Sequence, residues 1–228
     1  MSKKIKIIKD YYDDYVIYSK DSVTINTGFT MLCGCNGSGK STLLHQIQEY
    51  LKENKIPVYT YDDTTEGGLN ASNAMLYYGD IDMLTYNMMS SEGESRLNNL
   101  GRHLGSMKHF IETGLIKNMY KTTFGHDDSE ISSNERWILI DATTSGLSID
   151  VINEIIDIFN LMKEDAKKSN ADLYIVVAAN EYEVTQHADY CIDVQNLQNV
   201  KFETYDEYKK FILESRKQKD NRVKLDNE

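Results

Sequence analysis

The chain has little of several residue types that mark particular classes of protein. It contains three cysteines, one proline and one tryptophan in 228 residues. Cys33 and Cys35 lie too close along the chain for an ordinary disulfide, so we expect reduced thiols. No apolar run approaches the roughly 18 to 20 residues that span a bilayer, and the first residues lack the apolar stretch of a signal peptide. We therefore expect a cytoplasmic protein without membrane insertion.

Positive charge is also scarce. The 25 Lys and Arg residues are outnumbered by 36 Asp and Glu residues, which gives a formal charge of −11. A protein that coats nucleic acid unaided needs a surplus of Lys and Arg for contacts with phosphates. Nucleic acid binding is therefore not supported by the net charge, although a local basic face is compatible with it.

Hydrophobic patterning predicts strands that alternate with helices. Apolar runs predict buried strands at residues 29–33, 56–61, 138–140 and 173–178. Helical spacing of apolar residues predicts helices at residues 41–52 and 149–168. This alternation is typical of an α/β fold with a largely parallel sheet.

The rest of the chain predicts additions around that core. Short extended segments at residues 5–8, 15–18 and 23–25 predict a small antiparallel sheet, and residues 91–120 predict a helix interrupted near Gly101 and Gly105. Two short strands at 190–194 and 200–204 precede a helix over about 205–219. We divide the chain into one domain at 1–215, with a helical lobe at about 66–122, and a charged tail at 216–228.

A glycine-rich segment carries the strongest chemical signal. Between a predicted strand and a predicted helix lies Gly34-Cys35-Asn36-Gly37-Ser38-Gly39-Lys40-Ser41-Thr42, which fits the pattern G-x-x-x-x-G-K-[ST]. The glycines allow backbone N–H groups to turn inward around a phosphate, and the helix N-terminus adds its positive end. We call residues 34–42 the phosphate loop. It predicts ATP binding, with Lys40 on the β and γ phosphates and Ser41 on Mg²⁺.

An acidic residue at the end of a buried strand is the second signal. Asp141 follows Ile138-Leu139-Ile140, where its carboxylate would bind Mg²⁺ through water beside the phosphate loop. An Asp in this place is also common as a helix N-cap. The phosphate loop upstream favours the metal role.

With these motifs the chain resembles the ABC-type ATPase domains, in particular the soluble branch that includes RecF and the SMC-like ATPases. Val23 to Leu32 looks like the strands that precede the phosphate loop in this family. Ser90-Ser91-Glu92-Gly93-Glu94 resembles the signature motif, and Thr144-Ser145-Gly146-Leu147-Ser148 resembles the segment after the acidic strand. The resemblance implies a P-loop NTPase fold of ABC type, with a mixed central sheet, an N-terminal antiparallel part and a short helical lobe.

The signature resemblance also implies a partner. In the family, the N–H groups of this motif bind the γ-phosphate held by another subunit, which implies a homodimer with ATP at the interface and roles for Ser91 and Gly93. The alternative is a plain capping box of Ser91 with Glu94, which needs no ligand. One tyrosine near the N-terminus would resemble the family's adenine-stacking residue, although packing in the sheet explains each of them as well: Tyr11, Tyr12, Tyr15 and Tyr18.

Several positions depart from the family pattern. Ala142 stands where family members have the Glu that positions the attacking water, and Asn180 stands where they have a histidine. Asn180 can hydrogen-bond a phosphate but cannot titrate. No Gln occupies the metal-side position after Tyr61, where Asp62 or Asp63 would serve instead. A replacement carboxylate would come from Glu181, Glu183 or Asp150, and the spacing selects none of them.

The sequence thus predicts an ATP-dependent dimerisation switch whose hydrolysis of ATP is slow or conditional. The catalytic set would be Lys40, Asp141 and Asn180. An unidentified protein partner would read the dimer, in DNA maintenance or phage-related defence. The alternatives are the nucleotide-binding subunit of an ABC transporter and an ATP-dependent scaffold that does not hydrolyse ATP.

Overall fold

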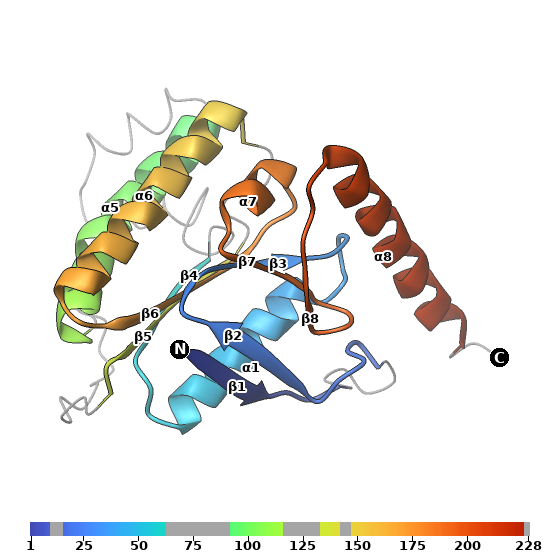
Figure 1. Ribbon diagram of the computed structural model, residues 1–228, viewed down its shortest axis with the longest axis horizontal. Coiled ribbons are helices and arrows are strands. Elements are labelled where there is room, and N and C mark those ends of the chain that lie inside the picture. The colour runs from blue at the N-terminus through green and yellow to red at the C-terminus, as the bar shows by residue number, and fades with distance from the viewer. Residues whose placement is uncertain (10–15, 63–91, 116–132, 142–146, 226–228) are drawn as a thin grey trace, which may run out of the picture.

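The computed structural model describes residues 1–9, 16–62, 92–115, 133–141 and 147–225. Within them a six-stranded sheet forms the centre of the molecule, in the order β4-β5-β6-β3-β7-β8 (Figure 1). All neighbouring strands are parallel except β7 and β8, which are antiparallel. The predicted α/β fold with a mixed central sheet is confirmed. The sheet strands are β3 (Gly28–Cys33), β4 (Val58–Asp62), β5 (Glu135–Asp141), β6 (Asp172–Ala178), β7 (Tyr190–Asp193) and β8 (Gln198–Val200).

One face of the sheet packs against α1 (Lys40–Glu53) and a two-stranded antiparallel sheet. This small sheet pairs β1 (Ser2–Lys6) with β2 (Ser22–Asn26), as the sequence predicted for the N-terminal part. Helix α1 is amphipathic, and its apolar stripe meets alternate residues of the central strands. The buried side chains from α1 are Leu43, Leu44, Ile47 and Leu51.

The opposite face is covered by α5 (Glu92–Thr113) and α6 (Ile149–Lys168), with the short α7 (Tyr182–His187) beside them (Figure 1). Phe29 of β3 meets Phe159 of α6 in an edge-to-face contact with ring centroids 5.0 Å apart. Side chains of β3 therefore alternate between the two covered faces, as expected for a central strand buried on both sides.

Helix α5 is continuous, so the predicted interruption near Gly101 and Gly105 is wrong. An interior glycine costs a helix roughly 1 kcal/mol relative to alanine. Burial of four apolar side chains of α5 against α6 and the sheet outweighs that cost: Leu100, Met107, Phe110 and Ile111.

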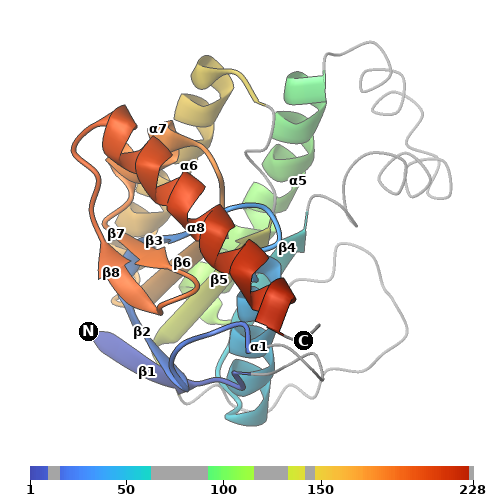
Figure 2. The same ribbon diagram turned by 90° about the vertical axis from the view of Figure 1, so that its right-hand side faces the viewer.

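The C-terminal helix α8 (Tyr205–Leu225) lies along one side of the molecule, away from α5 and α6 (Figures 1 and 2). It extends beyond the predicted end near Lys219 and includes most of the segment expected as a tail. Tyr208 packs edge-on against Phe202, and Phe211 also contacts Phe202. These aromatic contacts hold the start of α8 to the edge of the sheet that carries β7 and β8.

Two predicted strands differ from the structure. Residues 16–18, the described part of the predicted 15–18 strand, form no strand, and Tyr18 is buried beneath the phosphate loop instead. The second strand of the C-terminal pair is β8 at 198–200 rather than 200–204, because a tight turn returns the chain earlier. In that turn Leu197 has φ 48° and donates its N–H to the Asp193 carbonyl at 2.7 Å. No described helix combines the length and the apolar character needed to cross a bilayer.

Candidate functional site

The carboxyl ends of the parallel strands meet at one edge of the sheet. Strand β3 ends at Cys33 and leads into the phosphate loop, and its neighbours on the two sides are β6 and β7. On the far side of β6, the registers of β4 and β5 place Asp62 directly opposite Asp141. Ligands of open α/β sheets bind outside the carboxyl ends of the strands. This edge is therefore the candidate functional site.

The phosphate loop adopts backbone conformations that favour glycine. Gly37 has φ 74° and Gly39 has φ 105°, both in the left-handed region. The Tyr18 hydroxyl donates a hydrogen bond to the Gly39 carbonyl at 2.9 Å, and a Cβ at Gly39 would lie 2.6 Å from Ile17 Cγ2. Residues 17 and 18 thus support the loop from beneath and leave no space for a side chain at position 39.

Helix α1 begins directly after Gly39 with no side-chain cap and no acidic residue in its first turn. The first N–H groups of a helix have no partner within the helix, and they carry the positive end of its dipole. Together with the loop they form a site suited to an anion. Within the loop, the Ser38 N–H donates to the Cys35 carbonyl at 3.1 Å, which closes a turn, and the Ser38 side chain is buried.

Lys40 lies over the loop from the first position of α1. Its Nζ donates to the carbonyl oxygens of Gly34 at 2.8 Å and Cys35 at 3.1 Å. Burial lowers the pKa of Lys40, while neighbouring thiols and the carboxylates of Asp141 and Glu181 oppose that shift. The ammonium group is therefore held where three elements of the site converge: the loop, the end of β5 and the segment after β6.

Hard oxygen donors gather at this edge. Ser41 is exposed in the first turn of α1, and the carboxylates of Asp62 and Asp141 come from adjacent strand ends. Mg²⁺ is commonly bound by one or two carboxylates together with phosphate oxygens and water. The donor set thus fits Mg²⁺ with a phosphate ligand, and Asp62 is the described candidate for the metal-side position that the sequence left open between Asp62 and Asp63.

Asn180, the predicted third catalytic residue, reaches the phosphate loop. Its side-chain Nδ2 donates to Asn36 Oδ1 at 2.9 Å, and its backbone N–H donates to Glu181 Oε2 at 3.0 Å. Among the three candidate carboxylates, the negative charge of Glu181 opposes the lowering of the Lys40 pKa by burial. Glu183 lies on α7, and the Asp150 carboxylate lies at the start of α6, where hydrogen bonds from Ser148 and nearby backbone lower its pKa. Glu181 is therefore the candidate best placed for chemistry.

Of the remaining predicted site residues, some lie on described elements and others lie outside the described residues. Asn36 and Gly37 are exposed on the loop, and Thr42 is half-buried in α1. Gly93 lies in the first turn of α5, which begins at Glu92. Several predicted positions lie outside the described residues: Ser91, Ala142, residues 144–146 and the tyrosines Tyr11, Tyr12 and Tyr15. Tyr18 is fully buried, so it packs beneath the loop.

Sequence reasoning missed two residues of α8 that contact the loop. The Cys35 N–H donates to Ser215 Oγ at 3.1 Å, and Lys219 Nζ donates to the Asn36 carbonyl at 3.1 Å. The only sequence signal is their spacing, because positions 215 and 219 lie on one face of a helix. That signal was hidden by the charge-rich composition of the segment.

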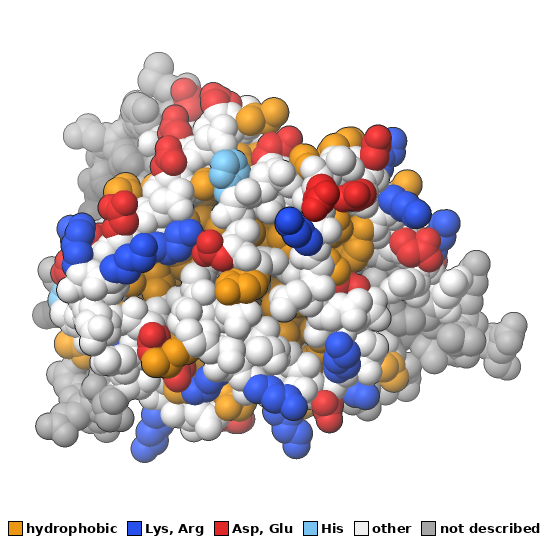
Figure 3. All heavy atoms as spheres, viewed as in Figure 1, with side chains coloured by type: hydrophobic (Ala, Val, Ile, Leu, Met, Phe, Trp, Pro, Cys, Tyr) orange, Lys and Arg blue, Asp and Glu red, His pale blue; other side chains and the backbone are white. Residues whose placement is uncertain are grey.

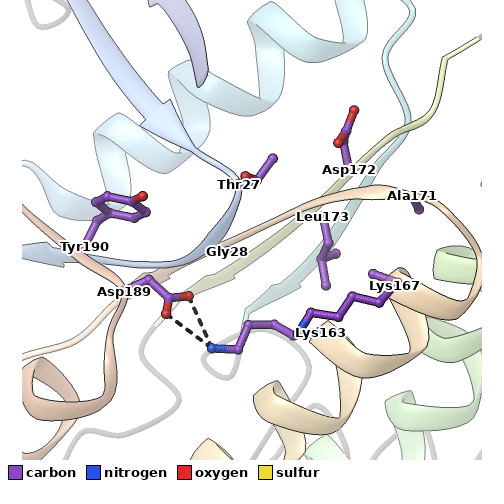
Figure 4. Close-up of a pocket in the computed structure, with 10 residues that line it drawn as sticks. Thr27, Gly28, Lys163, Lys167, Ala171, Asp172, Leu173, Asp189 and Tyr190 are labelled. Carbon is purple, nitrogen blue, oxygen red and sulfur yellow. Dashed lines mark hydrogen bonds and ion pairs between the residues drawn. The ribbon is translucent and has the colours of Figure 1, made fainter. Parts of the chain in front are cut away.

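A second hollow lies at the opposite edge of the sheet. This cavity of about 470 Å³ is lined by residues at the starts of β3, β6 and β7 and by two lysines of α6 (Figure 4). The Asp189 carboxylate there pairs with Lys163 at 3.2 Å and accepts the Phe29 N–H at 2.8 Å. These contacts fix the start of β3, so we assign the Asp189 pair a structural role.

Comparison with known proteins identifies the fold. No protein-family model matches the chain, and no curated protein matches it. A nucleotide-free ATP-binding cassette from an ABC transporter is 15% identical, with 94% of this chain and 95% of that chain covered and a TM-score of 0.50. The ADP conformation of MJ1267, an ATP-binding cassette of an ABC transporter, is 16% identical, with 95% and 98% covered and a TM-score of 0.51. At these identities the likeness shows the fold, which is that of an ABC-type P-loop NTPase.

Proposed function

We propose that the chain binds ATP with Mg²⁺ at the phosphate loop. The observation that carries this proposal is the meeting of the loop, the free N-terminus of α1, Lys40 and Asp141 at one edge of the sheet. Backbone N–H groups and the ammonium group of Lys40 supply donors and positive charge for the phosphates. Ser41 and Asp141 would hold Mg²⁺, with Asp62 beside them, and the ion would neutralise charge on the phosphate oxygens.

Hydrolysis in this proposal is slow or conditional. Ala142 follows the metal carboxylate and offers no group to position a water molecule. The Glu181 carboxylate, next to Asn180 and within the field of Lys40, is the described group that would take the proton of the attacking water as ADP and phosphate separate. Asn180 would hydrogen-bond the phosphate or the water. If Glu181 does not act in this way, the protein is a scaffold that binds ATP without hydrolysing it.

The biological output would be an ATP-dependent homodimer. Gly93 lies in the first turn of α5, and the N-terminus of a helix would supply donors for a γ-phosphate held by a second copy. The S-x-G-E-like sequence supports the soluble RecF and SMC-like branch, and with it a partner in DNA maintenance or phage-related defence. On the face shown in Figure 3, Lys and Arg side chains lie among Asp and Glu side chains. A protein partner therefore suits that face better than nucleic acid.

A transporter subunit is the second candidate function. It is favoured by the likeness to solved ATP-binding cassettes of ABC transporters, which covers nearly the whole of both chains. It predicts a membrane partner that binds this chain. Co-purification with a membrane protein from the native cell would favour it over the stand-alone switch.

Calorimetry with Mg²⁺-ATP tests nucleotide binding directly. Lys40→Ala should weaken binding by on the order of 10² or more, because charge-assisted hydrogen bonds to phosphate contribute about 1.5–3 kcal/mol each. The matched control is Lys52→Ala, which removes an exposed lysine from the last turn of the same helix and should leave affinity within about twofold. Equal affinity in Lys40→Ala and the wild type would refute the assignment of the loop.

Sedimentation with Mg²⁺ and a slowly hydrolysed ATP analogue tests the dimer. The wild type should dimerise with ATP but not with ADP, which lacks the bridging phosphate. Ser91→Arg should block association while the monomer still binds ATP. A wild-type protein that stays monomeric at tens of micromolar, with nucleotide shown to be bound, would contradict the dimer.

A further inference from the structure

One face of α8 lies against the phosphate loop. Tyr208, Ser215 and Lys219 are spaced by seven and four residues, so they lie on the same side of the helix. Each makes a hydrogen bond to the site: Ser215 and Lys219 to the loop itself, and Tyr208 to the Asn180 carbonyl. Helix α8 is therefore attached to the loop and to the residue that touches it. Figure 2 shows the helix crossing this side of the molecule.

Ser215 satisfies a donor at the start of the loop. It is only 3% exposed, and its hydroxyl accepts the Cys35 N–H at 3.1 Å. A buried N–H without an acceptor costs about 1–3 kcal/mol, so this contact favours the loop conformation in which residue 35 faces α8. Residue 35 also offers its carbonyl to Lys40. Ser215 thus contacts the N–H of Cys35 and Lys40 contacts its carbonyl, so both backbone groups of this residue are held.

Lys219 acts on the next peptide group. Its ammonium donates to the Asn36 carbonyl at 3.1 Å, and the same peptide group carries the N–H of Gly37. A charged donor at a carbonyl polarises the peptide and strengthens its N–H as a donor in turn. A Cβ at Gly37 would lie 2.9 Å from Lys219 Nζ, so the two groups are in close contact. The ammonium group lies against the outer, carbonyl side of the loop.

A second set of contacts joins α8 to the Asn36 side chain. The Tyr208 hydroxyl donates to the Asn180 carbonyl, and Asn180 Nδ2 donates to Asn36 Oδ1 at 2.9 Å. Asn36 is therefore held at its carbonyl by Lys219 and at its side chain through Asn180. Residues 35 and 36 at the start of the loop have thus lost conformational freedom before a ligand arrives, which reduces the entropy cost of binding.

We propose that α8 positions the phosphate loop, with Ser215 and Lys219 as positioning residues for nucleotide binding. The inference rests on the proposed function, since the loop must bind a phosphate for its conformation to matter. It adds a reciprocal link: the docked helix raises the affinity for ATP, and bound ATP stabilises the docked helix. Anything that draws α8 away from the loop would then release nucleotide.

Calorimetry on three lysine variants tests the role of Lys219. Lys219→Ala should weaken ATP binding about five- to twentyfold, and Lys219→Arg should restore most of the loss because it keeps a charged donor. The matched control is Lys217→Ala, which removes the same charge two residues away, where the lysine is exposed and pairs with Glu214 at 3.5 Å. That control should stay within twofold of the wild type. Ser215→Ala should weaken binding independently of charge.

Hydrogen exchange supplies a readout that a purely structural role would not change. In the wild type and in Lys217→Ala, Mg²⁺-ATP should slow amide exchange across residues 208–219. In Lys219→Ala this slowing should be lost, while the melting temperature without nucleotide stays the same.

The possible failures are distinguishable. If the wild type does not bind ATP, the proposed function fails and this inference fails with it. If Lys40→Ala abolishes binding while Lys219→Ala stays within twofold of the wild type, or binds more tightly, the positioning role is wrong and the proposed function stands. Equal losses of ATP affinity in Lys219→Ala and Lys217→Ala would show that the effect comes from the net charge of α8 alone, which would also overturn the inference.

Discussion

Two Gly→Ala substitutions should shift the free energy of unfolding in opposite directions. They test the tight backbone geometry of the phosphate loop and the open surroundings of Gly101 in α5. Gly39 has φ 105°, and a Cβ there would lie 2.6 Å from Ile17 Cγ2 and 3.2 Å from the Tyr18 hydroxyl. Gly101 lies in the interior of α5, where a Cβ would meet no described atom within 4 Å. The chemical change is the same, and the surroundings differ.

For Gly39→Ala two costs add. Placing a residue with a side chain in a sparsely populated left-handed conformation costs about 1–3 kcal/mol. Forcing a methyl group against Ile17 and Tyr18, which support the loop from beneath, costs about 1–3 kcal/mol more. We expect a loss of about 2–6 kcal/mol in the free energy of unfolding, a large part of the total stability of a domain. ATP affinity should fall as well, because the methyl group displaces the N-terminus of α1.

For Gly101→Ala the expected change is a gain. Alanine restricts the unfolded chain and suits the helix, so unfolding should cost about 0.5–1 kcal/mol more. Urea unfolding followed by far-UV circular dichroism measures both variants against the wild type, with equal slopes required for the comparison. A Gly39→Ala protein as stable as the wild type would refute the geometry of the loop. If Gly101→Ala lowers the free energy of unfolding by more than about 0.5 kcal/mol, the inference that the surroundings of Gly101 are open is wrong.

Two further predictions concern hydrolysis and pH. The rate of ATP hydrolysis by the wild type, measured as phosphate release in single turnover, should stay below about 1 s⁻¹. Ala142→Glu should raise this rate by on the order of 10² or more, and Glu181→Gln should lower any residual rate. A wild-type rate above about 1 s⁻¹ would show that a positioned base is already present. Burial raises the pKa of Tyr174 to about 12, so the unfolded chain loses this proton first and stability should fall as pH rises from about 10 to 12. Tyr174→Phe should show a smaller fall in chemical denaturation across that range, and an unchanged slope would contradict the assignment.

The parts of the fold that local patterns determine were predictable. Helix α6 occupies residues 149–168 as predicted, because its apolar residues recur at helical spacing and two lysines close its last turn. The strand, loop and helix unit at the phosphate loop followed from a motif whose residues act through local backbone geometry. Asp141 followed for the same reason, at the end of a continuous apolar strand.

The contacts made across the sequence were not predictable. Nothing near Ser215 or Lys219 indicates that they contact residues 35 and 36, because the pairing depends on how α8 leaves the edge of the sheet. The β7–β8 turn contains no glycine, and the weaker turn signals of Asp193 and Asn196 did not fix where the chain returns. Gly101 and Gly105 predicted a break that the packing of the helix overrides.

The central place of β3 has a consequence for how the protein is made. Both neighbours of this strand, β6 and β7, lie roughly 150 residues later in the chain, so a growing polypeptide has no partner for β3 until most of it has left the ribosome. At about 5–20 residues per second the wait is on the order of ten to thirty seconds. During that interval an apolar strand is exposed, and chaperones would have their main opportunity to bind it. A nascent chain that stops before β6 would contain the whole glycine-rich motif while β3 still lacks both of its neighbours in the sheet.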